Sequence, residues 1–394
     1  TKQHRFFYDD YVNLQHAALI SSSPWAIFGA ESKEHRRHPL YYGFFFVEKF
    51  FLGRNTQAYF VIAFFFHLLN AFLLIRLARR FRAPPSAAFL AGILFFSSSS
   101  FYNHMISFNG ASGHLTLSFF LLATLAWFRF LEGSRWGFLE ALLFQQLSLL
   151  TFDVAVVFPF LAFSLTWIFK RNSKERSHIL LRTILPFLIV DLVTFFLLTK
   201  DFWSSQVLVS RKISLLPVPY VLLKWASLVH MLVLPVLTWE KGSSPFAVLD
   251  LSFLGLLPLF FILLAGSVLL WRKKILFSLF NEVPRELLAA GVLWIVITIL
   301  PHMPHPLVFQ RASRYVLYPA AGFSILLGFF LARFFELLRH AYGRWGWIFY
   351  PLLLGSIVTV HLQNLSFQYD RYQRYLQDHP KEDFTARVER LLAQ

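Results

Sequence analysis

Cysteine is absent from the 394-residue chain, and acidic residues are scarce, with 21 Asp and Glu against 37 Lys and Arg. The absence of cysteine excludes a disulfide framework, a thiolate metal site and a catalytic thiol. Charged residues make up only 15% of the chain, and the apolar-polar alternation of a β-barrel is not visible. A soluble core of this composition would leave too much apolar surface in water, so a soluble protein is excluded.

Apolar and aromatic residues dominate instead. They form 57% and 19% of the chain, and the mean hydropathy is +0.55, which indicates a polytopic helical membrane protein. Many of the 49 Phe residues lie in runs such as Phe44-Phe45-Phe46, which suit lipid-facing or interfacial helix faces. The net charge of +16 lies mostly in short clusters between apolar stretches. These clusters indicate membrane topology rather than a nucleic-acid partner.

About ten stretches approach the length of roughly 20 residues that crosses a bilayer. They lie at 57–75, 86–106, 114–131, 137–151, 154–169, 179–199, 252–271, 286–300, 315–333 and 346–363. The predicted fold is therefore an all-α transmembrane bundle with interfacial helices in a first external loop. Its regions are the external loop 1–56, a transmembrane module 57–199, an external or re-entrant region 200–251, C-terminal transmembrane helices 252–363 and a short external helical tail 364–394.

Basic residues in alternate connections set the predicted orientation. The clusters are Arg76/Arg79/Arg80/Arg82, Arg129/Arg135, Lys170/Arg171/Lys174/Arg176, Arg272/Lys273/Lys274 and Arg333/Arg339/Arg344. Such clusters mark cytoplasmic loops, so the first loop faces outward. The apolar segment 216–237 would reverse the later loops if it crossed, and prolines mark its ends, so it is expected to lie in the outer interface or to dip in and return. A further helix is expected to precede Thr1.

Three outward-facing carboxylates carry the candidate chemistry. Asp9 and Asp10 precede the first crossing, and Asp153 lies in a short outer turn. A carboxylate at the membrane surface can deprotonate an acceptor group in glycosyl transfer with inversion, while cations stabilise a phosphate leaving group. The predicted external cations are Arg36, Arg37, His38, Arg211, Lys212, Arg311 and Arg314. The positive-inside rule expects few cations on the external side, so their presence there indicates that they bind a lipid phosphate at the interface.

Structural explanations of the same residues stay open. Asp9 and Asp10 would also suit the start of an interfacial helix, and Asp153 would suit a turn between packed helices. Each external arginine would also suit anionic headgroups in general. The functional interpretation depends on the occurrence of these residues together on one side.

A second group lies inside the membrane. Asp191 is near the middle of an apolar span, where an unpaired charge costs several kcal/mol. His67 and Asn70, three residues apart on one helix face, are its predicted partners in a structural polar cluster, with a proton relay as the alternative. His302 and His305 lie near no carboxylate in sequence, so no metal and no other cofactor is predicted, although a divalent metal stays open.

Three blocks of the chain resemble GT-C membrane glycosyltransferases, in particular bacterial proteins akin to the transmembrane and tetratricopeptide-repeat O-mannosyltransferases. The blocks are Asp9-Asp10 through Arg37-His38-Pro39-Leu40 to Phe66-His67-Leu68-Leu69-Asn70, then Thr151-Phe152-Asp153-Val154-Ala155-Val156, then Arg314-Tyr315-Val316-Leu317-Tyr318-Pro319. The resemblance implies a polyprenyl-phosphate sugar as donor, Asp9 or Asp10 as catalytic base and Asp153 as a second acid. It also implies phosphate binding by Arg314, with Arg37 and Arg311 as further candidates.

The chain departs from that pattern in four places. The helix expected before the Asp pair is absent, a histidine separates Arg37 from Pro39, Phe152-Asp153 replaces Lys-Glu, and no repeats follow Asp370. The departures leave open a non-catalytic subunit of the same fold within a larger assembly. A transporter or lipid flippase, with Asp191 as coupling residue, is the second alternative. The resemblance further implies a bacterial inner membrane, with the active side facing the periplasm or exterior and a protein or glycan as acceptor.

Overall fold

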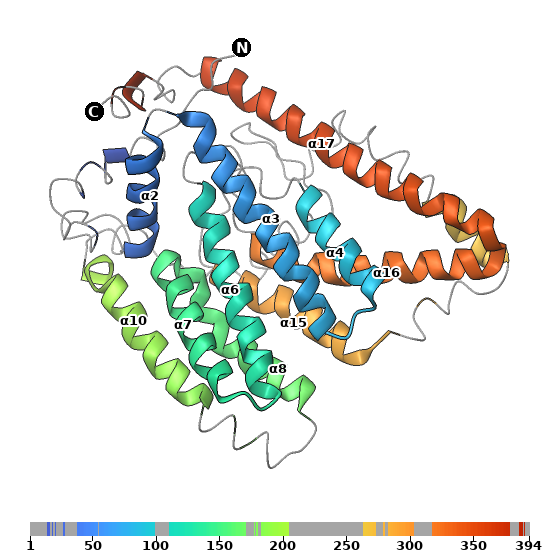
Figure 1. The fold of residues 1–394 in the computed structure, drawn as a ribbon, viewed down its shortest axis with the longest axis horizontal. Helices are drawn as coiled ribbons and strands as arrows, with labels where there is room; N and C mark the ends of the chain where they lie inside the picture. The colour runs from blue at the N-terminus through green and yellow to red at the C-terminus, as the bar shows by residue number, and fades with distance from the viewer. Residues whose placement is uncertain are drawn as a thin grey trace, which may run out of the picture.

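The computed structural model describes residues 14–15, 18, 20, 27, 38–53, 55–98, 110–170, 177, 179, 183–204, 263–272, 279, 283–302, 317–378, 386–388 and 390. The regular structure of these residues is helical, without strands, as the sequence predicts (Figure 1). The longer helices are α2 (Pro39–Leu52), α3 (Thr56–Arg80), α4 (Pro85–Ser97), α6 (Gly110–Leu131), α7 (Arg135–Thr151), α8 (Phe158–Phe169), α10 (Leu185–Ser204), α15 (Arg285–Ile299), α16 (Leu317–Tyr342) and α17 (Gly346–Asp378). Short 3₁₀ helices are η3 (Asp153–Val157), η5 (Leu300–His302) and η7 (Gly343–Trp345).

Each of the ten predicted crossing ranges overlaps a helix, and the range 252–271 overlaps the helix Leu263–Arg272. Among the described residues, three helical stretches are long and apolar enough to cross a membrane: Gln57–Arg80, Gly110–Leu131 and Leu317–Thr359. The structure therefore supports membrane character, and the number of crossings stays a prediction. Most of the region 200–251 lies outside the described residues.

The burial of side chains on α3 is the reverse of a water-soluble helix. Its exposed face carries the large apolar side chains Val61, Phe64, Phe65, Leu68 and Phe72. Its buried face includes the polar side chains of His67 and Asn70, which are 3% and 0% exposed. An apolar exterior around a polar helix contact is the arrangement expected in lipid, where polar groups must find partners inside the protein.

The core forms around α6, which packs against α3 on one side and α7 on the other (Figure 1). The Phe120 ring contacts the rings of Phe158, Trp294 and Tyr318 at centroid distances of 5.6, 5.4 and 5.2 Å. The Trp294 indole donates a hydrogen bond to the Tyr318 carbonyl over 2.8 Å. These contacts join α6 to α8, α15 and α16, helices that are distant in sequence.

Small residues let α16 approach α4 closely. A Cβ atom on Gly328 would lie 2.7 Å from the backbone nitrogen of Ala91 and 2.8 Å from the carbonyl oxygen of Ala87. Because these are backbone atoms, they cannot move aside as a side chain would. Close backbone approach at glycine and alanine is a common packing mode of membrane helices.

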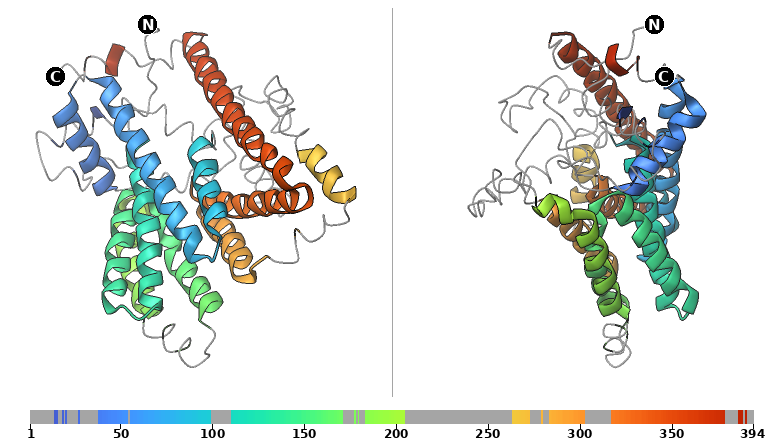
Figure 2. Two further views of the ribbon diagram at one scale, coloured as in Figure 1. Left: turned by 45° about the vertical axis from the view of Figure 1, so that its right-hand side comes forward. Right: turned by 90° about the vertical axis from the view of Figure 1, so that its left-hand side faces the viewer.

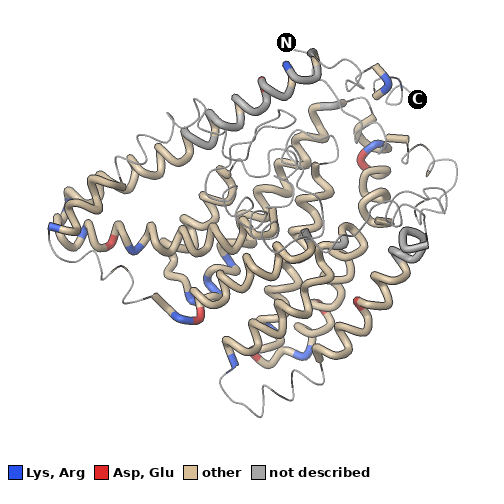
Figure 3. The backbone as a smooth tube through the Cα atoms, turned by 180° about the vertical axis from the view of Figure 1, so that it is seen from behind, with Lys and Arg blue, Asp and Glu red and all other residues tan. Residues whose placement is uncertain are grey.

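Three ion pairs join helix ends at one side of the bundle. The pairs are Arg80–Glu132, Arg82–Glu286 and Arg129–Glu140, and we call this side the paired edge. They bring the α3–α4 connection, the α6–α7 turn and the start of α15 together, and the charged residues in Figure 3 gather mainly at helix ends. The predicted cytoplasmic connections near residues 76–82 and 129–135 therefore lie at the same end, whichever side of a membrane it faces.

The last helix differs from the prediction. A span ending at 363 and a separate tail from 364 were expected, whereas α17 continues without interruption to Asp378. No proline or glycine occurs between residues 364 and 378, so nothing in the sequence ends the helix there.

Candidate functional site

The end of the bundle opposite the paired edge is built from α2, η3 and η5. Pro39 begins α2, where its missing N–H is no loss, and Gly53 ends it with a positive φ of 50°. The Tyr59 hydroxyl of α3 donates a hydrogen bond to the Gly53 carbonyl over 3.1 Å and fixes this corner. Figure 2 shows α2 beside the beginning of α3.

A ring contact joins the first loop to the acidic turn between α7 and α8. The His38 imidazole stacks on the Phe152 ring, with 5.4 Å between centroids and 27° between planes. His38 follows Arg37 directly, and Phe152 precedes Asp153, which begins η3. η3 also contacts η5, the start of the Pro301-His302 segment. Three stretches that are distant in sequence therefore meet at this end.

Most of the predicted catalytic and phosphate-binding residues lie outside the described part of the chain. These are Asp9, Asp10, Arg37, Arg311 and Arg314. Asp153 is described by its backbone alone, as the first residue of η3. The chemical roles given to these residues stay predictions. The contact between His38 and Phe152 joins the residue after Arg37 to the residue before Asp153.

Asp191 has a different partner from the predicted one. Its carboxylate Oδ1 accepts a hydrogen bond from the Gln146 amide nitrogen over 2.7 Å, and the Gln146 amide oxygen accepts one from the Thr194 hydroxyl over 2.8 Å. Asp191 is 1% exposed, and its second oxygen has no hydrogen-bond partner within the described structure. The three side chains clamp α10 to α7. The predicted pairing with His67 and Asn70 is therefore corrected, because α7 lies against α10 and supplies the nearer amide.

His67 and Asn70 instead join α3 to α6. The Asn70 amide donates to the His114 carbonyl over 2.8 Å, and its oxygen accepts from the Ser118 hydroxyl over 2.8 Å. The His67 Nε2 lies 2.9 Å from the Phe96 carbonyl oxygen, and its ring lies 4.8 Å from that of His114. Both side chains are buried and hydrogen-bonded, and their partners lie on α4 and α6.

Polar residues on α6 and α7 complete the network, and the sequence analysis missed them. The Ser148 hydroxyl donates to the Thr116 carbonyl over 3.0 Å, and the Thr116 hydroxyl donates to the Ser112 carbonyl over 2.7 Å. Polar links thus connect α3 to α6, α6 to α7, and α7 to α10. A usable signal was present, since Gln145, Gln146 and Ser148 interrupt an otherwise apolar stretch.

Glu48 on α2 is another residue that sequence reasoning missed. Its side chain is 3% exposed, and neither carboxyl oxygen has a hydrogen-bond partner in the described ranges. Burial raises the pKa of this carboxyl to about 8, so it is neutral at pH 7. Its signal in the sequence was a single acid among the aromatic residues of 39–52.

Metal binding has no support among the described residues, where no group of three or more His, Asp or Glu side chains could hold an ion. The His302 side chain and His305 lie outside what the structure describes. The end formed by α2, η3 and η5 offers a stacked aromatic contact beside the turn that carries Asp153, and buried Glu48 lies further along α2, in its second half.

No family model matches the chain, and no curated protein matches it.

Proposed function

We propose that the chain is a polytopic membrane glycosyltransferase of the GT-C type, which transfers a sugar from a polyprenyl phosphate to a protein or glycan acceptor. The observation that supports it most is the stacking of His38 on Phe152 over 5.4 Å. This contact joins His38, which follows Arg37 in the sequence, to Phe152, which precedes Asp153. A phosphate-binding cation and an acid that holds the acceptor or the sugar must approach the same donor, so the proposed transfer requires such a convergence.

The proposed reaction forms a bond between an acceptor atom and the anomeric carbon. Asp9 or Asp10 takes the acceptor proton, and the bond between the anomeric carbon and the phosphate oxygen breaks. The polyprenyl phosphate leaves with the electron pair of that bond, and the configuration of the anomeric carbon inverts. Arg37, Arg311 and Arg314 would stabilise the charge on the departing phosphate, and Asp153 would hold the acceptor or the sugar. No metal takes part in the proposed reaction.

Apolar helix faces next to the turn offer a place for the lipid part of the donor. Phe160 and Phe163 on α8 follow η3 by one and two helical turns, and both are exposed. In the proposed orientation this end faces the periplasm or cell exterior of a bacterial inner membrane. A polyprenyl chain would then lie along α8 in the bilayer while its phosphate reaches the turn.

The proposal is tested by sugar transfer from a panel of polyprenyl-phosphate sugars with the purified protein in lipid nanodiscs. The wild type is expected to turn over at least one donor. In Asp9→Asn/Asp10→Asn the rate is expected to fall about 100-fold or more, as for removal of a general base. A large loss is also expected in Asp153→Asn. Glu132→Gln, at the paired edge, is the matched control and keeps the wild-type rate.

Two results would replace this proposal. A stable association with other membrane proteins, without turnover of any donor, would identify the chain as a non-catalytic subunit. Movement of a substrate across the bilayer that stops in Asp191→Asn would identify a transporter. The clamp between Asp191 and Gln146 leads us to expect that Asp191→Asn lowers stability and leaves sugar transfer in place.

A further inference from the structure

The corner between α16 and α17 has a tightly fixed backbone. Gly343 adopts a positive φ of 55°, which other residues rarely adopt. A Cβ atom on Gly346 would lie 2.6 Å from the backbone nitrogen and Cα of Arg339. The two glycines therefore allow α17 to begin directly against the last turn of α16.

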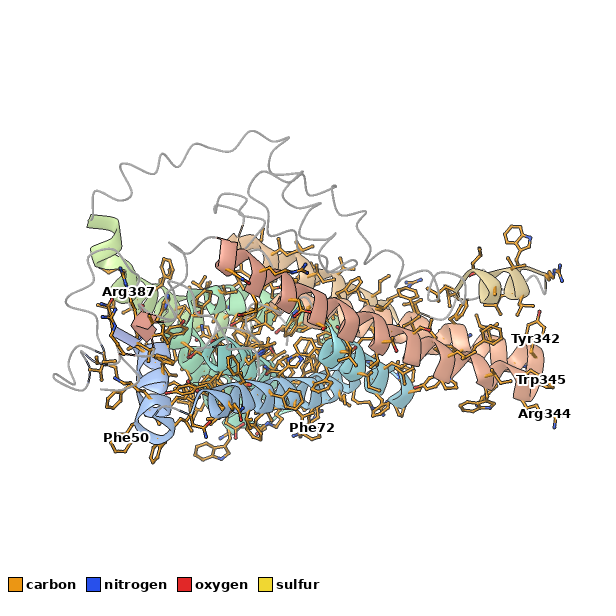
Figure 4. The ribbon with its side chains drawn as sticks, turned by 90° about the horizontal axis from the view of Figure 1, so that it is seen from above. Phe50, Phe72, Tyr342, Arg344, Trp345 and Arg387 are labelled. Carbon is orange, nitrogen blue, oxygen red and sulfur yellow. The ribbon has the colours of Figure 1, made fainter. Side chains whose placement is uncertain are left out.

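Arginines at this corner lie beside exposed indoles. The Arg339 guanidinium carbon lies 5.5 Å from the centroid of the Trp347 ring, and that of Arg344 lies 5.6 Å from the Trp345 ring. Trp345 and Trp347 are 63% and 57% exposed. Figure 4 shows Arg344 and Trp345 at the far end of the molecule.

A third segment brings the same two residue types to the corner. The Tyr342 hydroxyl donates a hydrogen bond to the Leu269 carbonyl over 2.9 Å, which holds the helix Leu263–Arg272 against the end of α16. Trp271 and Arg272 end that helix, and both are exposed. We call Trp271, Arg272, Arg339, Arg344, Trp345 and Trp347 the aromatic corner.

Among the described residues, no acidic side chain forms an ion pair with the arginines of the aromatic corner. Glu336 is the one acid in α16, η7 and the helix Leu263–Arg272, and it pairs with Arg333 over 3.2 Å. Arg272, Arg339 and Arg344 form no ion pair within the described ranges. Within the part of the chain that the structure describes, these three cations are therefore available for an anion.

We propose that the aromatic corner binds the phosphate headgroup of an anionic phospholipid at the membrane surface. Exposed indoles favour the boundary between headgroups and acyl chains, where the ring is partly apolar and its N–H reaches water. A guanidinium donates two parallel hydrogen bonds to a phosphate, and the cation–π contacts hold Arg339 and Arg344 beside the indoles. Arginines at a bilayer surface also attract anionic lipids by charge. This site is separate from the proposed transferase site and does not depend on it.

Lipid binding to the purified, delipidated protein in detergent tests the proposal, with native mass spectrometry as the readout. Phosphatidylglycerol and phosphatidylcholine are titrated against the wild type, Arg339→Gln/Arg344→Gln and the control Arg76→Gln/Arg135→Gln. The control removes the same charge from two exposed arginines near the paired edge. The preference for phosphatidylglycerol is expected to fall roughly 30-fold in the corner variant, from the contribution of two interfacial arginines, and to persist in the control.

Two further measurements complete the test. Trp345→Leu/Trp347→Leu keeps the charges, and it is expected to weaken binding of both lipids by about threefold through loss of the indole contacts. Inorganic phosphate at millimolar concentration is expected to leave the bound phosphatidylglycerol in place. Equal losses in the corner variant and its control would overturn the proposal, because net charge alone would then explain binding. Displacement by inorganic phosphate would overturn the assignment to a lipid.

Discussion

The paired edge and the aromatic corner are both rich in arginine, but their charges are balanced in different ways. At the paired edge, three arginines face Glu132, Glu140 and Glu286. At the aromatic corner, Arg272, Arg339 and Arg344 form no ion pair among the described residues, and Arg339 and Arg344 lie beside tryptophans instead. The positive-inside rule counts Lys and Arg residues in connections between spans, so it does not distinguish these two regions. Their contacts do distinguish them: the ion pairs of the paired edge hold helices together, whereas the arginines of the aromatic corner can bind an anion from outside the chain.

The comparison also shows that exposure decides what an unpaired charge costs. Arg339 and Arg344 are exposed, so water or lipid headgroups solvate their charges. Glu48 has no hydrogen-bond partner among the described residues either, but it is buried and avoids charge by keeping its proton. An unpaired group at the surface can bind a ligand, whereas a buried one makes stability depend on pH.

The largest expected effect is the dependence of stability on the protonation of Glu48. Its pKa is about 8 in the folded protein and 4.5 as a free group, so the folded state holds the proton more tightly. Stability is therefore fully present below pH 4.5 and is lost as pH rises toward 8, by about 3 kcal/mol between pH 4.5 and pH 7 as an upper bound. Glu48→Gln is expected to remove this part of the pH dependence, as measured by denaturant midpoints in detergent.

Exposed Glu336→Gln is the matched control, and its stability should follow pH as the wild type does. A Glu48→Gln variant with an unchanged pH profile would mean that Glu48 is charged and paired in solution. The distinction between buried and exposed unpaired charges would then not apply to this residue.

A smaller effect is expected at the aromatic corner from Gly346→Ala. The new Cβ atom would lie 2.6 Å from the Arg339 backbone, which cannot yield without moving α17 away from α16. Overpacking of this kind costs about 1–3 kcal/mol, and the movement should also separate Trp347 from Arg339 and weaken phosphatidylglycerol binding. Both effects are measured on one preparation, by denaturant midpoint and by native mass spectrometry.

Gly355→Ala provides the control on the same helix, because nothing lies within 4 Å of its added Cβ atom. This variant is expected to gain roughly 0.5–1 kcal/mol from helix propensity and to bind lipid as before. If Gly346→Ala were as stable as Gly355→Ala, the close turn between α16 and α17 would not exist as described.

The helices were predictable because each depends on a local property of the sequence. Apolar length located ten ranges that all overlap helices, and Pro39 and Pro85 begin α2 and α4. The end of α17 was not predictable from hydropathy, because a helix can continue in water or at an interface after its apolar residues end. The sequence becomes more polar at residue 364, but no proline or glycine there ends the helix.

The polar contacts were predictable as a class but not as pairs. Asp191 was expected to need a partner, and it has one, but Gln146 is 45 residues away on a helix that a single sequence does not place next to α10. The stacking of His38 on Phe152 is equally distant in sequence. Which helix faces meet depends on the rotation and neighbours of each helix, and hydropathy gives neither.

The variant with the smallest expected change in stability also tests whether lipid binding at the aromatic corner depends on unpaired charge alone. Glu132→Gln/Glu140→Gln removes two carboxylates from the paired edge and leaves Arg80 and Arg129 without their ion pairs. These pairs are substantially exposed, so their loss should cost less than about 1 kcal/mol in total.

In the same variant Arg80 and Arg129 lack ion pairs, as Arg339 and Arg344 do, but among the described residues neither has a cation–π contact with an indole, the exposed Trp136 of this edge included. If unpaired cations suffice, native mass spectrometry will show a second bound phosphatidylglycerol of similar affinity to the first. We expect a second lipid that binds about threefold or more weakly, because a guanidinium held against an indole is already positioned at headgroup depth. Equal affinities would leave the tryptophans without a role in binding, and the contrast between the two regions would then rest on Glu132 and Glu140 alone.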